Sequence, residues 1–195
     1  MMRLKKYQVK EGAHSFQPVG GIEPPCLKKN VTRIIWKVRI GDLRYTLPHP
    51  DNRDINKGGG ISFDVLTNHV DAAMWGWRYW NDKGIDSVQF FSYCHVNGGT
   101  IKGHSAKPRL RPEDPEVLLE VPHDSKQVVT ITLDIHWDRK VYAFLFEDGA
   151  GFAQRTETPF THNKKLGRTI GTWFGGDFPS PRPLHLFVGR EIIKK

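Results

Sequence analysis

Alternation of apolar and polar side chains along short segments is the feature that most constrains the fold of this chain. The clearest example is residues 128–137, VVTITLDIHW, where every second position is apolar: Val129, Ile131, Leu133, Ile135 and Trp137. The positions between them hold Thr, Asp or His. A period of two is typical of a half-buried β-strand, because successive side chains point to opposite faces. We therefore predict a strand with its apolar face against a core.

Further strands are predicted where related patterns recur, at 31–40, 72–80, 87–96, 140–149 and 183–189. Turn-forming residues join several of them, namely NDKG at 81–84, NGG at 97–99 and the pair Asp138 and Arg139. Such turns favour hairpins between consecutive antiparallel strands. Without a helical pattern to connect the strands, the sequence predicts an all-β fold, an antiparallel β-sandwich of jelly-roll type with long loops.

A chain of 195 residues suits one domain. We predict a single sandwich domain over residues 30–195, preceded by an N-terminal extension or first strand over residues 1–29. The proline-rich segment 107–122, KPRLRPEDPEVLLEVP, is predicted to be a long connection across one end, since proline is unsuited to a central strand.

The tryptophan-rich segment 72–80, AAMWGWRYW, raises the question of core against binding surface. In a strand, Trp75, Trp77 and Tyr79 share one face, and Gly76, Arg78 and Trp80 share the other. We predict that Trp77 is buried, as is Trp137, because large strand aromatics are usually core residues. Trp75 fits a core and an exposed platform equally well. A glycan platform here is predicted to use Trp75, Arg78, Tyr79 and Trp80.

The net charge of +8 and the pI near 9.5 favour polyanionic partners. Lysine doublets are scattered along the sequence: Lys5, Lys6, Lys28, Lys29, Lys164, Lys165, Lys194 and Lys195. They lack the arginine and aromatic pattern of a nucleic-acid motif, so no specific nucleic-acid binding is expected.

Targeting and redox signals are also weak. No apolar run follows the basic N-terminal residues, and no segment reaches the roughly 20 apolar residues that cross a bilayer, so neither a secretory signal nor a membrane span is expected. Cys26 and Cys94 are predicted to be free thiols, with a disulfide between them left open.

No catalytic, metal or cofactor site is predicted. Two carboxylates alternating on one strand would suit glycoside hydrolysis, and no predicted strand carries such a pair. Asp54, Asn56 and Gly58 are spaced like calcium ligands, but Val65 occupies the position where the full loop needs a glutamate, so a calcium site is a minor alternative.

Short motifs recur along the chain: Asn56 and Lys57; Gly76, Trp77 and Arg78; Asn97 and Gly98; and Phe174, Gly175, Gly176 and Pro179. With these motifs, nearly the whole chain resembles a poorly characterised family of small β-sandwich proteins encoded by tailed phages and by gut bacteria that carry phage-like genes. The resemblance implies a non-enzymatic sandwich in a phage setting. Independently, Gly76 suits a close backbone approach, and Gly175 with Gly176 suits a bend before the last strand.

Three functions follow as hypotheses. The first is a non-enzymatic structural or capsid-decoration protein of a phage particle, made in the host cytoplasm and contacting other virion proteins or copies of itself. The alternative is a carbohydrate-binding module that recognises a cell-surface glycan, such as one used in host adsorption. The third is a polysaccharide lyase or glycosidase, with Tyr, His and Arg as the lyase residues.

Overall fold

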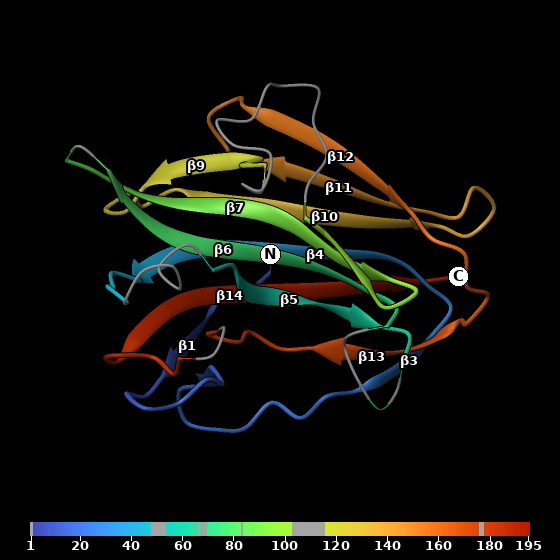
Figure 1. Cartoon of the computed structure of the whole chain (residues 1–195), viewed down its shortest axis with the longest axis horizontal. Helices are drawn as coiled ribbons and strands as arrows, with labels where there is room; N and C mark the ends of the chain where they lie inside the picture. The colour runs from blue at the N-terminus through green and yellow to red at the C-terminus, as the bar shows by residue number, and fades with distance from the viewer. Residues whose placement is uncertain are drawn as a thin grey trace.

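The computed structural model describes residues 2–47, 54–64, 66, 70–82, 84–102, 116–175 and 178–195. In this part of the chain all regular elements are β-strands, and they form two antiparallel sheets that lie against each other (Figure 1). The predicted all-β antiparallel sandwich of jelly-roll type is confirmed.

The first sheet has the strand order β12-β11-β10-β4-β14-β1-β2. Its strands, in chain order, are β1 (Lys5–Val9), β2 (Gln17–Pro18), β4 (Val31–Asp42), β10 (Val128–His136), β11 (Val141–Glu147), β12 (Ala153–Pro159) and β14 (Leu184–Lys194). The three central strands β10, β4 and β14 pair along most of their length. They carry one wall of the cleft described below.

The second sheet has the order β3-β13-β5-β6-β7-β8, and β9 also pairs with β7. Its strands are β3 (Leu27–Lys29), β5 (Asn56–Ser62), β6 (Ala72–Asp82), β7 (Ile85–Val96), β8 (Gly99–Lys102), β9 (Leu119–Pro122) and β13 (Leu166–Ile170). Part of the predicted connection 107–122 therefore forms an edge strand, which accommodates Pro122 at its end; residues 107–115 lie outside the described part.

The predicted hairpins are present. Asp82 pairs with Ile85, and Val96 pairs with Gly99 across a turn in which Asn97 has φ 51° and Gly98 has φ 78°. Two successive positive φ angles match the right-handed twist of the flanking strands, which explains the Asn-Gly pair. Strand β10 turns into β11 between His136 and Val141.

The core lies between the sheets and is rich in aromatic rings. Trp77 is fully buried, as predicted, with the rings of Phe16 and Tyr45 packed edge-on against it. Trp75 is fully buried as well, so of the two interpretations left open for it the core is right and the exposed platform is wrong. Both indoles project from β6 toward the first sheet, because the face that they share with Tyr79 is the inner one.

Several of the motif residues named above, Asn56, Lys57, Gly76 and Gly175, lie close together at one junction. The Asn56 side chain donates to Tyr45 Oη at 3.0 Å and accepts from the Gly175 N–H at 2.8 Å. Lys57 and Trp173 exchange two backbone hydrogen bonds. Gly76 has no room for a Cβ, which would lie 2.3 Å from Ile55 Cγ2. These motifs hold the fold together here; Gly176 lies outside the described residues.

Cys94 is buried and Cys26 partly exposed, and both are free, as predicted. Within the described ranges there is no helix of the length and apolarity needed to cross a membrane. The same ranges contain no group of His, Cys, Asp or Glu side chains that is arranged to hold a metal ion.

Candidate functional site

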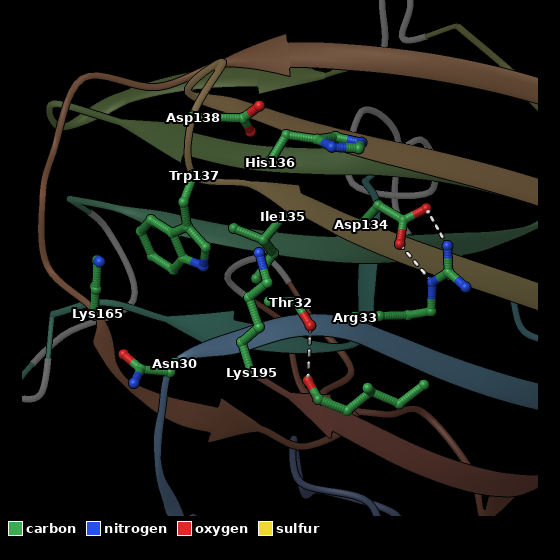
Figure 2. A pocket seen from close by; sticks show the side chains of 11 residues that line it. Asn30, Thr32, Arg33, Asp134, Ile135, His136, Trp137, Asp138, Lys165 and Lys195 are labelled. Atoms are coloured by element: carbon green, nitrogen blue, oxygen red, sulfur yellow. Dashed lines mark hydrogen bonds and ion pairs between the residues drawn. The ribbon is translucent and has the colours of Figure 1, made fainter.

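A cleft of about 900 Å³ lies where the ends of β4, β10 and β14 come together (Figure 2). The lining residues come from these strand ends, from the β10–β11 turn and from the segments before β4 and β13: Asn30, Thr32, Arg33, Asp134, Ile135, His136, Trp137, Asp138, Lys165, Ile193 and Lys195. A volume of this size is within the range of small-molecule sites.

Trp137 provides the aromatic surface of the cleft. It is the first residue after β10, at the margin of the core between the sheets, so its indole is only partly buried. Phe63 and Phe160 pack edge-on against the ring, with centroids 5.3 and 5.5 Å away. Nε1 donates a 2.8 Å hydrogen bond to the Val31 carbonyl. The indole is thus fixed in place, and the prediction that Trp137 is buried holds only in part.

Arg33 and Asp134 form an ion pair on one side of the cleft. They face each other on the paired strands β4 and β10. Arg33 Nε lies 2.5 Å from Asp134 Oδ1, and a terminal guanidinium nitrogen lies 3.1 Å from Oδ2. This two-point contact orients both side chains and largely neutralises their charges within the cleft.

Asp138 is the second carboxylate of the cleft, in the turn after Trp137. Backbone N–H groups of the turn, that of Arg139 first, lower the pKa of Asp138 by hydrogen-bonding its charged form. Asp138 is therefore an ionised hydrogen-bond acceptor at neutral pH.

Asn30, Lys165 and Lys195 line the cleft on the side away from Asp138 (Figure 2). Their backbones are joined directly: Asn30 N–H donates to the Lys165 carbonyl at 3.0 Å, and Lys195 N–H donates to the Asn30 carbonyl at 3.1 Å. Asn30 adopts φ 54°, a left-handed conformation that asparagine tolerates better than most residues. Three chain segments thus bring an amide and two ammonium groups to one site.

The predicted platform residues do not form an exposed surface. Trp75 is inaccessible, and Arg78 and Tyr79 are 4% and 9% exposed. Arg78 lies on the outer face of the second sheet, 4.4 Å from the Trp80 ring centroid and 2.7 Å from Gln89 Oε1. Of the four, Trp80 alone is more than marginally exposed, and Arg78 stacks on its ring. The prediction of a glycan platform at these four residues is therefore wrong, and their role is structural.

A second cavity, of about 440 Å³, lies at the edge where the N-terminal segment passes the second sheet. Trp173, which is 45% exposed and stacks on His14, forms part of its lining. Sequence patterns gave no reason to single out Trp173, since its exposure depends on the distant residues Ser15 and Lys57 that pair with it.

Tyr7, Glu23 and Arg190 form a hydrogen-bond network at this cavity. Tyr7 donates to one Glu23 oxygen, and Arg190 donates to the other at 2.6 Å. Burial, followed by the Glu23 contact, raises the pKa of Tyr7. Tyr7 and Glu23, which line this cavity, are thus already hydrogen-bonded within the protein.

Comparisons with known proteins bear on the fold only loosely. No protein-family model and no curated protein matches the sequence. Similar solved structures include peanut lectin with a 9mer peptide, at 10% identity and TM-score 0.42 over 99% of this chain and 100% of that chain. Basic winged bean lectin with the Tn antigen gives 12% identity and TM-score 0.34 over 88% and 78%.

The third is the κ-carrageenase of Pseudoalteromonas carrageenovora with an oligotetrasaccharide of κ-carrageenan, at 10% identity and TM-score 0.37 over 98% and 80% of the two chains. At such identities and TM-scores, the likeness carries no argument about site or ligand. The fold assignment above depends on the strand pairing, and the function proposed below on the cleft itself.

Proposed function

We propose that this protein binds carbohydrate, without turning it over, in the cleft beside Trp137. The observation that carries the proposal is the convergence of one fixed, partly exposed indole with amide, hydroxyl, carboxylate and ammonium groups around a space of about 900 Å³. Sugars present apolar ring faces and many hydroxyl groups. A site of this composition can contact the ring face through Trp137 and hydrogen-bond the hydroxyls through its polar side chains.

The polar groups offer both donors and acceptors. Asn30 and Lys165 supply N–H donors, and the ionised Asp138 accepts hydrogen bonds. A sugar hydroxyl does both at once. Trp137 is positioned before any ligand arrives, because Val31, Phe63 and Phe160 hold it, and such preorganisation lowers the entropic cost of binding.

The chemistry of the carboxylates favours binding over hydrolysis. Glycosidases of the two-carboxylate kind need an acid whose pKa is raised, so that it stays protonated near neutral pH. Asp138 has a lowered pKa, and both oxygens of Asp134 contact the Arg33 guanidinium. Neither carboxylate in the described lining suits the role of proton donor.

A glycan array followed by isothermal titration calorimetry tests the proposal. Asn30→Gly is the first variant, because glycine keeps the left-handed backbone at φ 54° and removes the side-chain amide. We expect it to weaken sugar binding by about three- to tenfold, the loss of one hydrogen bond worth about 1 kcal/mol. Trp137→Phe should also weaken binding, although it loses the hydrogen bond to Val31 as well.

Two control variants separate this site from others. Lys126→Ala changes an exposed lysine before the other end of β10, away from the cleft, and should bind normally. Trp173→Ala removes the exposed indole of the second cavity and should also bind normally. Loss of binding in Trp173→Ala with none in Asn30→Gly would transfer the site to the second cavity. An array without any bound glycan would refute the proposal.

Membership of a phage particle, which the sequence resemblance implies, remains a separate prediction. It is compatible with sugar binding, since virion proteins can carry adsorption sites. Mass spectrometry of purified particles from the source of this chain tests it directly: peptides of this chain in stoichiometric amount support it, and their absence rejects it.

A further inference from the structure

We propose that the ligand of the Trp137 cleft is an acidic glycan, one that carries carboxylate or sulfate groups. This inference rests on the carbohydrate-binding function proposed above and specifies the class of sugar. It follows from two observations. Lysines that are far apart in the sequence lie close together beside the cleft, and most of them form no salt bridge with a described acidic residue.

Three of the four lysine doublets converge around Asn30. Lys28 and Lys29 precede it in β3, and Lys29 pairs with Leu166, the residue after the doublet Lys164 and Lys165. The third doublet ends β14, where Lys194 pairs with Val31 and Lys195 bonds to Asn30. Strand pairing thus gathers charges that the sequence separates. We call these three doublets the lysine cluster.

Most of the cluster has no acidic partner. Lys164 pairs with the buried Asp71 at 3.0 Å, and the nearby Arg33 pairs with Asp134. Over the described ranges, no salt bridge involves the other five lysines of the cluster. Segments 27–33 and 161–170, which meet here, contain no Asp or Glu, and the third segment, 190–195, contains one, Glu191. Positive potential therefore remains on this side of the cleft, where Lys165 and Lys195 line it.

The available charges suit acidic sugar groups. An ammonium on a flexible stem is a point charge that adapts to a carboxylate or a sulfate at varying positions along a chain. The single guanidinium in the cleft lining is already committed to Asp134. Trp137 is the single Trp, Tyr or Phe of that lining, whereas single-stranded nucleic acids usually need successive large stacking rings along a basic groove. We therefore favour an acidic glycan over nucleic acid.

The experiment compares two oligosaccharides of equal length that differ in charge, oligogalacturonate and its methyl ester. Calorimetry with the full chain should give tighter binding of oligogalacturonate. Raising salt from about 0.1 M to about 1 M, which shortens the Debye length from about 10 Å to about 3 Å, should remove most of this preference and leave binding of the ester nearly constant.

The double variant Lys165→Gln with Lys195→Gln removes both charges from the lining and keeps polar side chains. It should weaken oligogalacturonate binding by about two- to thirtyfold, since each of the two lost pairs contributes roughly 0.2–1 kcal/mol, and weaken ester binding less, because Gln keeps an N–H donor at each position. Lys126→Gln, away from the cleft, should change neither. Circular dichroism and thermal melting should show that the variants fold. We expect folding to be retained, because Lys165 and Lys195 are both exposed.

The possible contrary results are distinguishable. Equal affinity for both oligosaccharides, unchanged in the double variant, would overturn this inference and leave the carbohydrate-binding proposal standing. Failure to bind either oligosaccharide, together with an empty glycan array, would overturn both. Tighter binding of an oligothymidylate of equal charge than of oligogalacturonate would overturn the inference in favour of nucleic acid.

Discussion

The indole of Trp75 lies directly on Gly58: a Cβ at that glycine would come within 2.0 Å of Trp75 Cζ3. The two residues are on the neighbouring strands β5 and β6, with Gly59 beside Trp75 in the ladder. Gly58 and Gly59 therefore provide space for a core indole. This contact also explains why Trp75 is buried and cannot serve as a platform.

Gly58→Ala should consequently be strongly destabilising. The added methyl group meets a rigid ring in a filled core, so we expect a loss of about 3 kcal/mol or more in the free energy of unfolding, at the upper end for overpacking. Urea denaturation measures it. Gly21→Ala is the matched control, because nothing lies within 4 Å of a Cβ there. Similar denaturation midpoints for the two variants would contradict the Trp75–Gly58 contact.

Trp77→Ala should lower the free energy of unfolding by about 3–5 kcal/mol, the range for large aromatic truncations in a core. Trp80→Ala should cost only about 1–2 kcal/mol, because Trp80 is half-exposed and mainly loses its contact with Arg78. Trp77 Nε1 is buried and forms no hydrogen bond with a described residue, so Trp77→Phe should be tolerated better than Trp77→Ala. An unchanged melting temperature for Trp77→Ala would contradict its core position.

Sequence patterns predicted the strands that bury one alternating face, and they missed strands of other kinds. Strand β10 has an apolar residue at every second position and was predicted closely. Strand β12, AQRTETP, is at the edge of its sheet and buries only two threonines, so it has no apolar period to detect. Strand β5 contains three consecutive glycines, and the role of Gly58 and Gly59 is visible only once Trp75 is placed against them.

The candidate site was harder to predict than the fold, because it depends on long-range pairing. The segment 72–80 was correctly expected to divide its aromatic residues between two faces, but which face lies inside the sandwich depends on the first sheet. Lys165 and Lys195 meet Asn30 only through the β3–β13 and β4–β14 pairings. No local pattern around any of the three residues indicates that contact.

The two thiols should differ sharply in reactivity. Cys94 is fully buried in β7, and burial raises its pKa to about 12, so its thiolate is scarce at neutral pH. Cys26 is partly exposed. Ellman's reagent should modify one thiol per native chain and two in guanidinium chloride, and Cys26→Ser should abolish the native reaction. Rapid labelling of both thiols in the native protein would contradict the burial of Cys94.

Acid should destabilise the fold through His162, which is buried among Phe63, Phe160 and Tyr142. Its Nε2 lies 2.5 Å from Tyr142 Oη. Burial lowers the pKa of His162, and the ammonium groups of Lys164 and Lys140 add to this effect against the opposing charge of Asp71. In the unfolded chain the imidazole has its ordinary pKa near 6.5 and takes up a proton first as the pH falls.

Below pH 6.5 the unfolded state binds more protons than the folded state. The stability that neutral His162 contributes should therefore be complete above its ordinary pKa, and the free energy of unfolding should decline as the pH falls from there through the folded pKa. The pKa values of His123 and His185 are also lowered by burial and act in the same direction. Urea midpoints measured between about pH 8 and pH 5 should therefore fall, and His162→Gln should flatten the decline. Thr161→Ala, a neighbouring exposed change without a titratable group, should retain it. A decline of equal slope in His162→Gln and the unmodified chain would exclude His162 as its source.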